Sequence, residues 1–301
     1  MREAKARLKE FWIKGKRINL LKHKAAIRKQ VEKTIRREIK YISSFFPYNI
    51  EKFHNRSLLY FQSIFLMENY QENHEINDTA PEQKQYARKV MNLVVGLELL
   101  SIGTAFHDFK SSGSFLSPDD HSGEIEKEYT LDLLFGDIFY SRAVIYLLRF
   151  EDHDVFDRIL ASLKELHESR LILHRSIGDL LMEEGDLSNL EDHMDPEYLI
   201  RANGLLDISF DISFEIFCEK SARKGKNKFP GLLKQITILK TYGELLKYIQ
   251  FLKMAPLAEK ISSYFTSENN FTDRKLSDII SELDAGSFKS SIEGLLGSLD
   301  N

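Results

Sequence analysis

The sequence has few residues that break helices and a single residue that could form a disulfide. Gly (15) and Pro (6) are scarce among 301 residues, which favours long helices. The lone Cys218 excludes an internal disulfide and a multi-cysteine metal site, and fits a reducing cytosol. The first forty residues lack the uninterrupted apolar run of a signal peptide, and the longest apolar stretch, 91–106, is short for a membrane span and carries Glu98. We therefore expect a cytoplasmic protein that is at most peripheral to a membrane.

The charge of the chain is small but unevenly distributed. Residues 1–40 contain fifteen Lys or Arg and four Glu, a balance of +11, whereas the whole chain has a net charge of −4. The remaining residues therefore carry −15. Such asymmetry is typical of a segment that meets something anionic, and we expect an anionic membrane surface rather than a nucleic acid as the partner of residues 1–40.

Almost every segment has the apolar spacing of a helix, and neither an alternating strand pattern nor a fixed-period repeat is present. The pattern predicts an all-α fold, a bundle of long helices. It divides into a basic helical arm (1–46), a bundle (47–255) and a tail of shorter helices (256–301). The expected helices span 2–45, 50–69, 82–109, about 125 to 150, 154–183, 196–222 and 231–252.

The stretch GTAFHDFKSSG (103–113) ends a long apolar helix on a His-Asp pair. A Mg²⁺ site for a diphosphate needs several carboxylates on one helix face, at i and i+3 or i+4. This stretch offers only Asp108, followed by Phe109 and by Ser112. Spacing alone therefore favours a polar helix end, with His107 near the helix dipole and Asp108 capping the loop.

Gly136 interrupts a run of large apolar residues, at a cost of about 1 kcal/mol relative to Ala, so it has a packing or ligand reason. Close approach of two helices is the simpler reason. Helical spacing places four residues on the same face: Gly136, Tyr140, Ala143 and Leu147.

Two other groups of polar residues are weaker candidates. Asp119, Asp120 and Glu124 could form a loop metal site, but they lack calcium-loop spacing and also suit an acidic helix N-terminus. His167 and His174 lie seven residues apart around Arg170, which is not a metal-ligand spacing. A solvated or interface face is expected there.

Taken in order, LELLSIGTAFHDF, a loop and LDLLFGDIFYSRAVIYLL resemble the trans-polyprenyl diphosphate synthases, all-α enzymes whose apolar helix ends in HDDxxD and whose later helix begins with Gly-Asp-Tyr. The interval from His107 to Gly136 matches that family. The metal ligands do not: the second and third aspartates fall on Phe109 and Ser112. The arginine pair falls near Ser117 and Pro118, and Gln250 and Phe251 replace aspartates of the second motif.

The chain is more similar to the non-catalytic small subunit of the two-subunit enzymes, heptaprenyl diphosphate synthase component 1, over residues 55–255. The resemblance implies an isoprenoid synthase fold and an accessory subunit, inactive alone, that is required by an Asp-rich catalytic partner in a heterodimer. It implies long-chain prenyl diphosphate synthesis for quinone (menaquinone) side chains, with Mg²⁺ on the partner and none bound by this chain. It further implies that residues near the two landmarks line the elongation channel or the subunit interface. The candidates are Phe106, Phe135, Gly136, Asp137, Phe139 and Tyr140.

Two alternatives stay open. The chain could be a stand-alone, divergent class I terpene synthase that uses Asp119, Asp120 and Glu124. It could also be a helical scaffold without prenyl chemistry. Mg²⁺-dependent turnover by the isolated chain would distinguish the first from the second.

Overall fold

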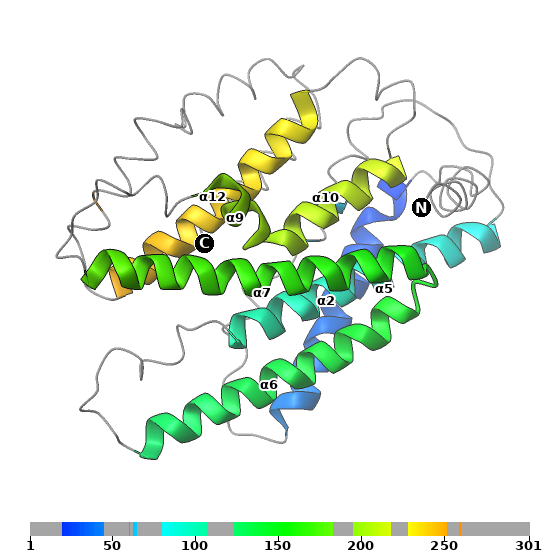
Figure 1. Cartoon of the computed structure of the whole chain (residues 1–301). Helices are drawn as coiled ribbons and strands as arrows, with labels where there is room; N and C mark the ends of the chain where they lie inside the picture. The colour runs from blue at the N-terminus through cyan, green and yellow to red at the C-terminus, as the bar shows by residue number, and fades with distance from the viewer. Residues whose placement is uncertain are drawn as a thin grey trace. The chain divides into compact units, whose positions relative to one another are not determined.

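The structure is a computed structural model, and it describes residues 20–44, 60, 63–64, 80–107, 123–182, 195–217, 228–251 and 259 (Figure 1). Within these ranges the regular structure is entirely helical, so the all-α prediction is confirmed for the described part of the chain. The long helices are α2 (Leu20–Ser43), α5 (Ala80–Phe106), α6 (Gly123–Leu148), α7 (His153–Met182), α10 (Gly204–Phe217) and α12 (Lys228–Phe251), and α9 (Pro196–Arg201) is short.

The chain forms two compact units. The first comprises Met1–Gln62 and Glu72–Phe156, and the second comprises Ser63–Gln71 and Asp157–Asn301. Helices α2, α5 and α6 therefore belong to the first unit, while α9, α10, α12 and most of α7 belong to the second.

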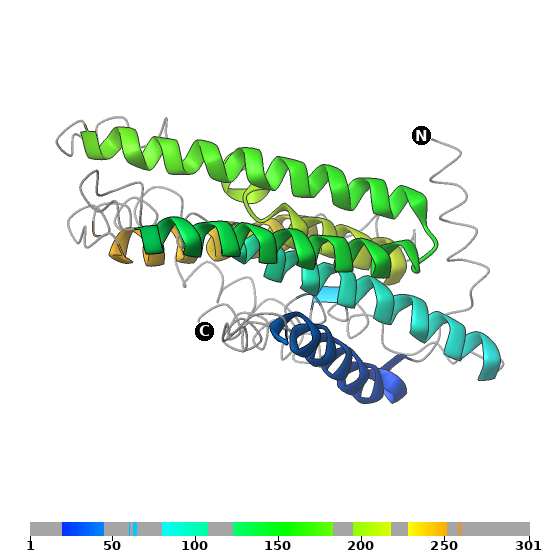
Figure 2. The ribbon, with the colours of Figure 1, turned by 90° about the horizontal axis from the view of Figure 1, so that it is seen from below.

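In the first unit, α5 is the core helix. Every side chain from Asn92 to Leu100 is buried, because this half of the helix is apolar apart from Asn92 and Glu98, and Glu98 accepts a 2.9 Å bond from the backbone N–H of Tyr60. Helix α6 packs along α5, and α2 packs against α5 as well (Figure 2). The window Ala87–Phe106 is long and apolar enough to cross a membrane, but 83% of it is buried inside the protein, as in the core helix of a globular unit.

A buried ion pair attaches α2 to α6. The carboxylate of Glu38 has a side-chain exposure of only 3%, and it accepts a 2.7 Å hydrogen bond from Nε of Arg142. The Tyr146 hydroxyl donates a 2.6 Å bond to its other oxygen, and Arg37 donates to that hydroxyl over 3.1 Å. Burial and the bond to Glu38 raise the pKa of Tyr146. Because each polar group here has a charged or hydroxyl partner, the buried charge is compensated.

In the second unit, α9 and α10 pack against α12. The side chain of Asp195 caps α9, accepting a 2.7 Å bond from the backbone N–H of Glu197. The prediction of one continuous helix over 196–222 is wrong, because the chain turns at Ala202 and Asn203 between α9 and α10. At Gly204 a Cβ would lie 3.1 Å from the Ser162 carbonyl oxygen, so this position suits a residue without a side chain.

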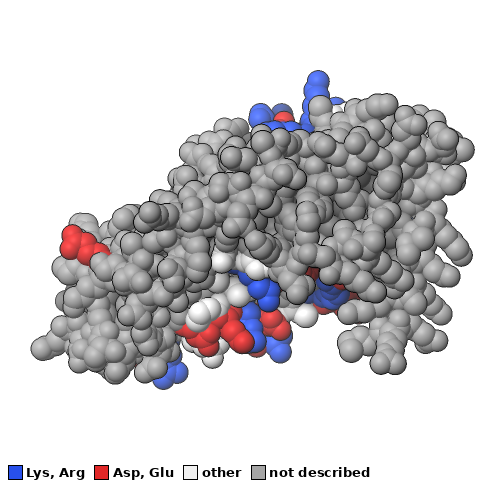
Figure 3. All heavy atoms as spheres, turned by 90° about the horizontal axis from the view of Figure 1, so that it is seen from above, with Lys and Arg blue, Asp and Glu red and all other residues white. Residues whose placement is uncertain are grey.

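The other predicted helices agree with the structure where it describes them. The helices predicted over 82–109, about 125 to 150, 154–183 and 231–252 correspond to α5, α6, α7 and α12, and α2 lies within the predicted 2–45. Most of the predicted helix 50–69 and most of the tail 256–301 lie outside the described residues. On the face drawn in Figure 3, described acidic and basic side chains lie beside one another.

Candidate functional site

Helices α5 and α6 interlock through three glycines, each of which makes room for a large side chain of the other helix. Gly96 lies against Leu147, where a Cβ would come within 2.5 Å of the leucine, and Gly103 lies against the Tyr140 ring, where the distance would be 2.6 Å. Gly136 of α6 lies under the imidazole of His107. The positions on the α5 side rise by seven and then four residues, from 96 to 103 to 107. Their partners on α6 fall by the same intervals, from 147 to 140 to 136, so the two helices pack in an antiparallel register.

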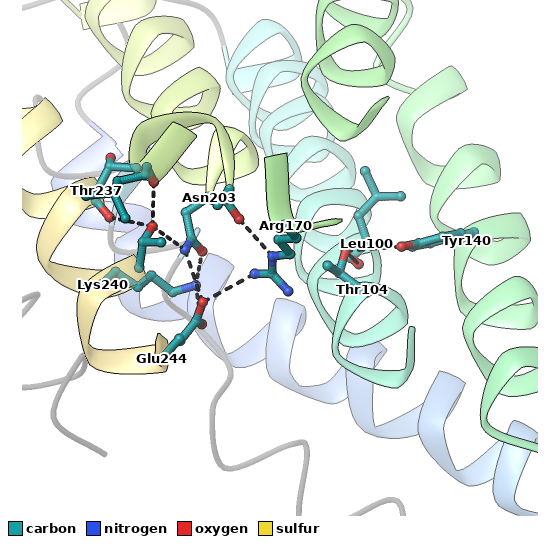
Figure 4. Close-up of polar contacts among 11 residues, drawn as sticks. Leu100, Thr104, Tyr140, Arg170, Asn203, Thr237, Lys240 and Glu244 are labelled. Atoms are coloured by element: carbon teal, nitrogen blue, oxygen red, sulfur yellow. Dashed lines mark hydrogen bonds and ion pairs between the residues drawn. The ribbon is translucent and has the colours of Figure 1, made fainter. Parts of the chain in front are cut away.

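This register brings together the two sequence landmarks, His107 and Gly136-Asp137. The His107 ring stacks on the Tyr140 ring with a centroid distance of 4.9 Å and an interplanar angle of 20°. Its Nε2 atom lies 3.4 Å from Oδ1 of Asp137. The Tyr140 hydroxyl donates to Oγ1 of Thr104 over 3.3 Å, and Thr104 donates to the Leu100 carbonyl over 2.8 Å (Figure 4).

The electrostatics of this junction favour a neutral imidazole. Burial lowers the pKa of His107 below its usual 6.5, and the nearby Asp137 carboxylate offsets part of that effect. The His107 side chain is 17% exposed, whereas that of Asp137 is 71% exposed. At neutral pH the pair is therefore mostly a neutral ring beside a hydrated carboxylate, and Coulombic attraction between them is weak.

An aromatic cluster lies next to this junction. The Phe106 ring is 5.5 Å from that of Phe135 and 5.7 Å from that of Phe139, and the second pair is stacked. All three side chains are at most 2% exposed. The sequence prediction that these rings form an apolar wall of a channel or an interface stays a prediction, since the structure places them in a packed cluster of the first unit.

The donor set of the junction does not suit a Mg²⁺ cluster. His107 and Asp137 supply two donors, and Mg²⁺ bridging to a diphosphate requires several carboxylates. Within the ranges that the structure describes, no three His, Cys, Asp or Glu side chains gather as a metal site. The residues Asp108, Phe109, Ser112, Asp119 and Asp120 lie outside those ranges, as do Ser117 and Pro118. Glu124 falls in α6, and Gln250 and Phe251 in α12, but only their backbone is described.

A second polar cluster, in the second unit, was not identified from the sequence. Asn203, only 2% exposed, donates from Nδ2 to Oγ1 of Thr241 over 2.7 Å and to Oε2 of Glu244 over 3.0 Å (Figure 4). Lys240 donates to Oδ1 of Asn203 over 2.6 Å and to Oε1 of Glu244 over 3.0 Å. Arg170 donates to the Ala202 carbonyl over 2.8 Å and to Glu244 over 3.3 Å.

The Asn203 cluster joins α7, the turn between α9 and α10, and α12. Of the solvated or interface face expected around Arg170, the structure shows an interface between helices, because the Arg170 side chain is only 15% exposed and bonds to the Ala202 carbonyl and to Glu244. Two cations, Arg170 and Lys240, share the carboxylate of Glu244. The signal for this cluster in the sequence was a polar Asn-Gly pair inside an apolar helical pattern, which indicates a turn.

Two carboxylates on α10 also lie close together, at i and i+4. Burial, and next the charge of Asp211, raise the pKa of Asp207 to about 6, although Lys234 opposes this shift. Burial also raises the pKa of Asp211, and Arg158 opposes it. Arg158 in turn bonds to Glu215 over 2.9 Å. The raised pKa values predict that protonation of these carboxylates below neutrality relieves their mutual repulsion on α10.

Comparison with known proteins assigns no family to this chain. No protein family model matches this chain, and no curated protein matches it. Among solved structures, it is similar to an isoprenoid synthase family member from Thermotoga neapolitana DSM 4359, with a TM-score of 0.47 and 11% identity over 90% of this chain and 98% of that chain. At this identity and TM-score the likeness assigns no activity, substrate or partner to the chain.

Proposed function

We propose that this chain is the accessory, non-catalytic subunit of a two-component long-chain trans-polyprenyl diphosphate synthase that makes quinone side chains. The observation that supports this proposal best is the α5–α6 junction. The His107 and Gly136-Asp137 landmarks, which carry the sequence resemblance, meet in one antiparallel register. The sequence lacks the second and third aspartates of the family's motif, since Phe109 and Ser112 occupy those positions.

In this proposal the division of labour follows from the side chains. Ionisation of an allylic diphosphate needs Mg²⁺ held by several carboxylates, and these belong to the Asp-rich partner. This chain shapes the apolar channel, in which the packed Phe106, Phe135 and Phe139 rings form the interior of the wall and bring no polar group that would need hydration. His107, largely neutral at pH 7, adds no charge beside that surface. The complex works in the cytoplasm, at the membrane into which its apolar product passes.

The outer face of α6, opposite the face that packs on α5, is the surface on which we propose that the partner chain binds. Leu134, Ile145 and Leu148 are 45%, 38% and 47% exposed. Together with Ile138 and Ser141 they follow the alternating three- and four-residue spacing of a helix-pairing seam. Exposed apolar side chains at such spacing mark interaction sites, and the occupant proposed here is a helix of the catalytic subunit.

The experiment mixes this chain with an Asp-rich polyprenyl diphosphate synthase subunit from the same cell. Isopentenyl diphosphate incorporation into products primed by farnesyl diphosphate is measured with Mg²⁺. We expect the mixture to be active, this chain alone to be inactive, and a heterodimer to elute on gel filtration. The double variant Leu134→Glu with Leu148→Glu should abolish both the complex and the activity. The control variant Leu171→Glu, at an exposed position of α7, should preserve them.

Two outcomes would refute the proposal. Mg²⁺-dependent turnover by the chain alone, abolished by Asp120→Ala, would identify a stand-alone terpene synthase. Failure to bind the subunit, either diphosphate or a prenyl chain would leave a helical scaffold without prenyl chemistry.

A further inference from the structure

Helix α2 has two faces of opposite character. Five aliphatic side chains on one face are between 0% and 6% exposed: Ile27, Val31, Ile35, Ile39 and Ile42. This face packs against α5, and the buried Glu38 bonds to Arg142 and Tyr146 of α6. The apolar half of the helix is therefore already used by the first unit, and α2 cannot insert it elsewhere without unfolding that contact.

The opposite face is a basic stripe, defined here as Lys29, Lys33, Arg36 and Lys40. These positions follow the i, i+4, i+7, i+11 spacing of one helix face, and all four residues are exposed. At 1.5 Å per residue the stripe is about 16 Å long. No acidic residue occupies a position in this series.

The neighbouring acids on α2 are engaged with other cations. Glu32 bonds to Arg28 over 3.1 Å, and Glu38 is buried against Arg142. Arg37 is turned toward the Tyr146 hydroxyl and does not belong to the stripe. The four side chains of the stripe are exposed on the side of α2 opposite its buried isoleucines and valine, so an anionic surface can approach them from that side.

We propose that the basic stripe of α2 docks this protein on an acidic phospholipid bilayer by charge alone, without insertion. A bilayer presents a two-dimensional array of phosphates that a straight row of four cations can meet from one side. The proposal rests on the first unit only, and it is independent of the proposed prenyl chemistry.

The test uses the full chain in co-sedimentation with vesicles of phosphatidylcholine, alone or with 30% phosphatidylglycerol. The variant Lys29→Gln, Lys33→Gln, Arg36→Gln, Lys40→Gln removes the stripe. A matched control, Arg88→Gln, Lys164→Gln, Arg175→Gln, Arg201→Gln, removes the same charge from exposed positions on other helices. Circular dichroism and thermal unfolding verify that both variants are folded.

Each Lys or Arg near an acidic surface contributes a factor of about five in partition, so loss of the stripe should weaken binding by on the order of several hundred-fold. The control variant should change binding less than tenfold. Raising NaCl from 0.1 M to 1 M should release the wild-type protein, because the Debye length falls from about 10 Å to 3 Å.

Four results would overturn the proposal: equal binding to neutral vesicles, equal losses in the two variants, binding of the stripe variant within threefold of wild type, or a salt-resistant bound fraction. Tighter binding to duplex DNA than to acidic vesicles, lost in the same stripe variant, would identify a nucleic-acid site instead.

Discussion

Replacing Gly103 by alanine tests the interlocked register of α5 and α6. In the structure a Cβ at this position would lie 2.6 Å from two atoms of the Tyr140 ring and 3.1 Å from the carbonyl oxygen of Gly136. The ring cannot simply move away, because it is stacked against His107 and its hydroxyl bonds to Thr104. The backbone oxygen is still less able to move, so the two helices must separate.

The size of the effect follows from two opposing terms. Overpacking in a well-packed core costs about 1–3 kcal/mol, while Ala is better than Gly in a helix by up to about 1 kcal/mol. We expect Gly103→Ala to lower the free energy of unfolding by about 1–2 kcal/mol. Gly178 of α7 is the matched control, because a Cβ there would meet nothing within 4 Å, and Gly178→Ala should stabilise by about 0.5–1 kcal/mol.

Urea unfolding followed by circular dichroism measures both changes, and a double-mutant cycle assigns the first. In the Tyr140→Ala background the ring is gone and the contact with the Gly136 oxygen remains, so Gly103→Ala should cost much less than in the wild-type protein, with a coupling energy of about 1–2 kcal/mol. If Gly103→Ala stabilises the wild-type protein as Gly178→Ala does, or if the coupling energy is below about 0.5 kcal/mol, the register is wrong.

Three further predictions concern the charged groups. In an NMR titration the pKa of His107 should lie below 6.5, and Asp137→Asn should lower it further, because the carboxylate opposes the effect of burial; an unchanged or raised value would contradict the contact. The raised pKa of Asp207, about 6, means that the folded state binds this proton more tightly than the unfolded chain. The free energy of folding that is lost by burying the ionised Asp207 is therefore largest above pH 6 and vanishes as the pH falls toward 4. Asp207→Asn should stabilise the protein by about 1–2 kcal/mol at pH 7.5 and by almost nothing at pH 4. Equal stabilisation at both pH values would refute the shift. Glu38→Leu leaves Arg142 and the Tyr146 hydroxyl without their acceptor and should cost about 2–4 kcal/mol in urea unfolding, whereas Glu32→Gln, in an exposed pair, should cost at most about 0.5 kcal/mol.

The long helices could be predicted from the sequence because their apolar spacing is regular and breakers are few. The exception, the turn at Ala202 and Asn203, lies inside an apolar pattern that continues on both sides of it. That turn is stabilised by contacts distant in the sequence, since Asn203 bonds to Thr241 and Glu244 of α12. Local helix propensity cannot predict contacts with residues so distant in the sequence, and these contacts override the helix propensity of the segment here.

For the candidate site, the sequence located both landmarks and the helix face that joins them. The structure agrees that Gly136, Tyr140, Ala143 and Leu147 face α5, because each contacts or adjoins a glycine or His107 of that helix. The sequence did not reveal what lies against that face. The sequence analysis made no prediction for Gly96 and Gly103. Two glycines seven residues apart in an otherwise bulky apolar helix nevertheless indicate close helix approach.

The three glycine contacts also specify the register more strictly than hydrophobicity could. Helix α5 is buried on all sides from Asn92 to Leu100, so burial alone would accept α6 at several positions along it. If α6 slid by one turn, the Tyr140 ring would leave Gly103 and meet the buried Leu99 or Leu100, where no space exists, while Leu147 would leave Gly96 at the same time. Leu147, Tyr140 and His107 therefore fit against their glycines only in one common register. The meeting of His107 with Gly136 is a consequence of that joint fit, so disturbing Gly96 or Gly103 should displace His107 as well, although neither glycine touches it.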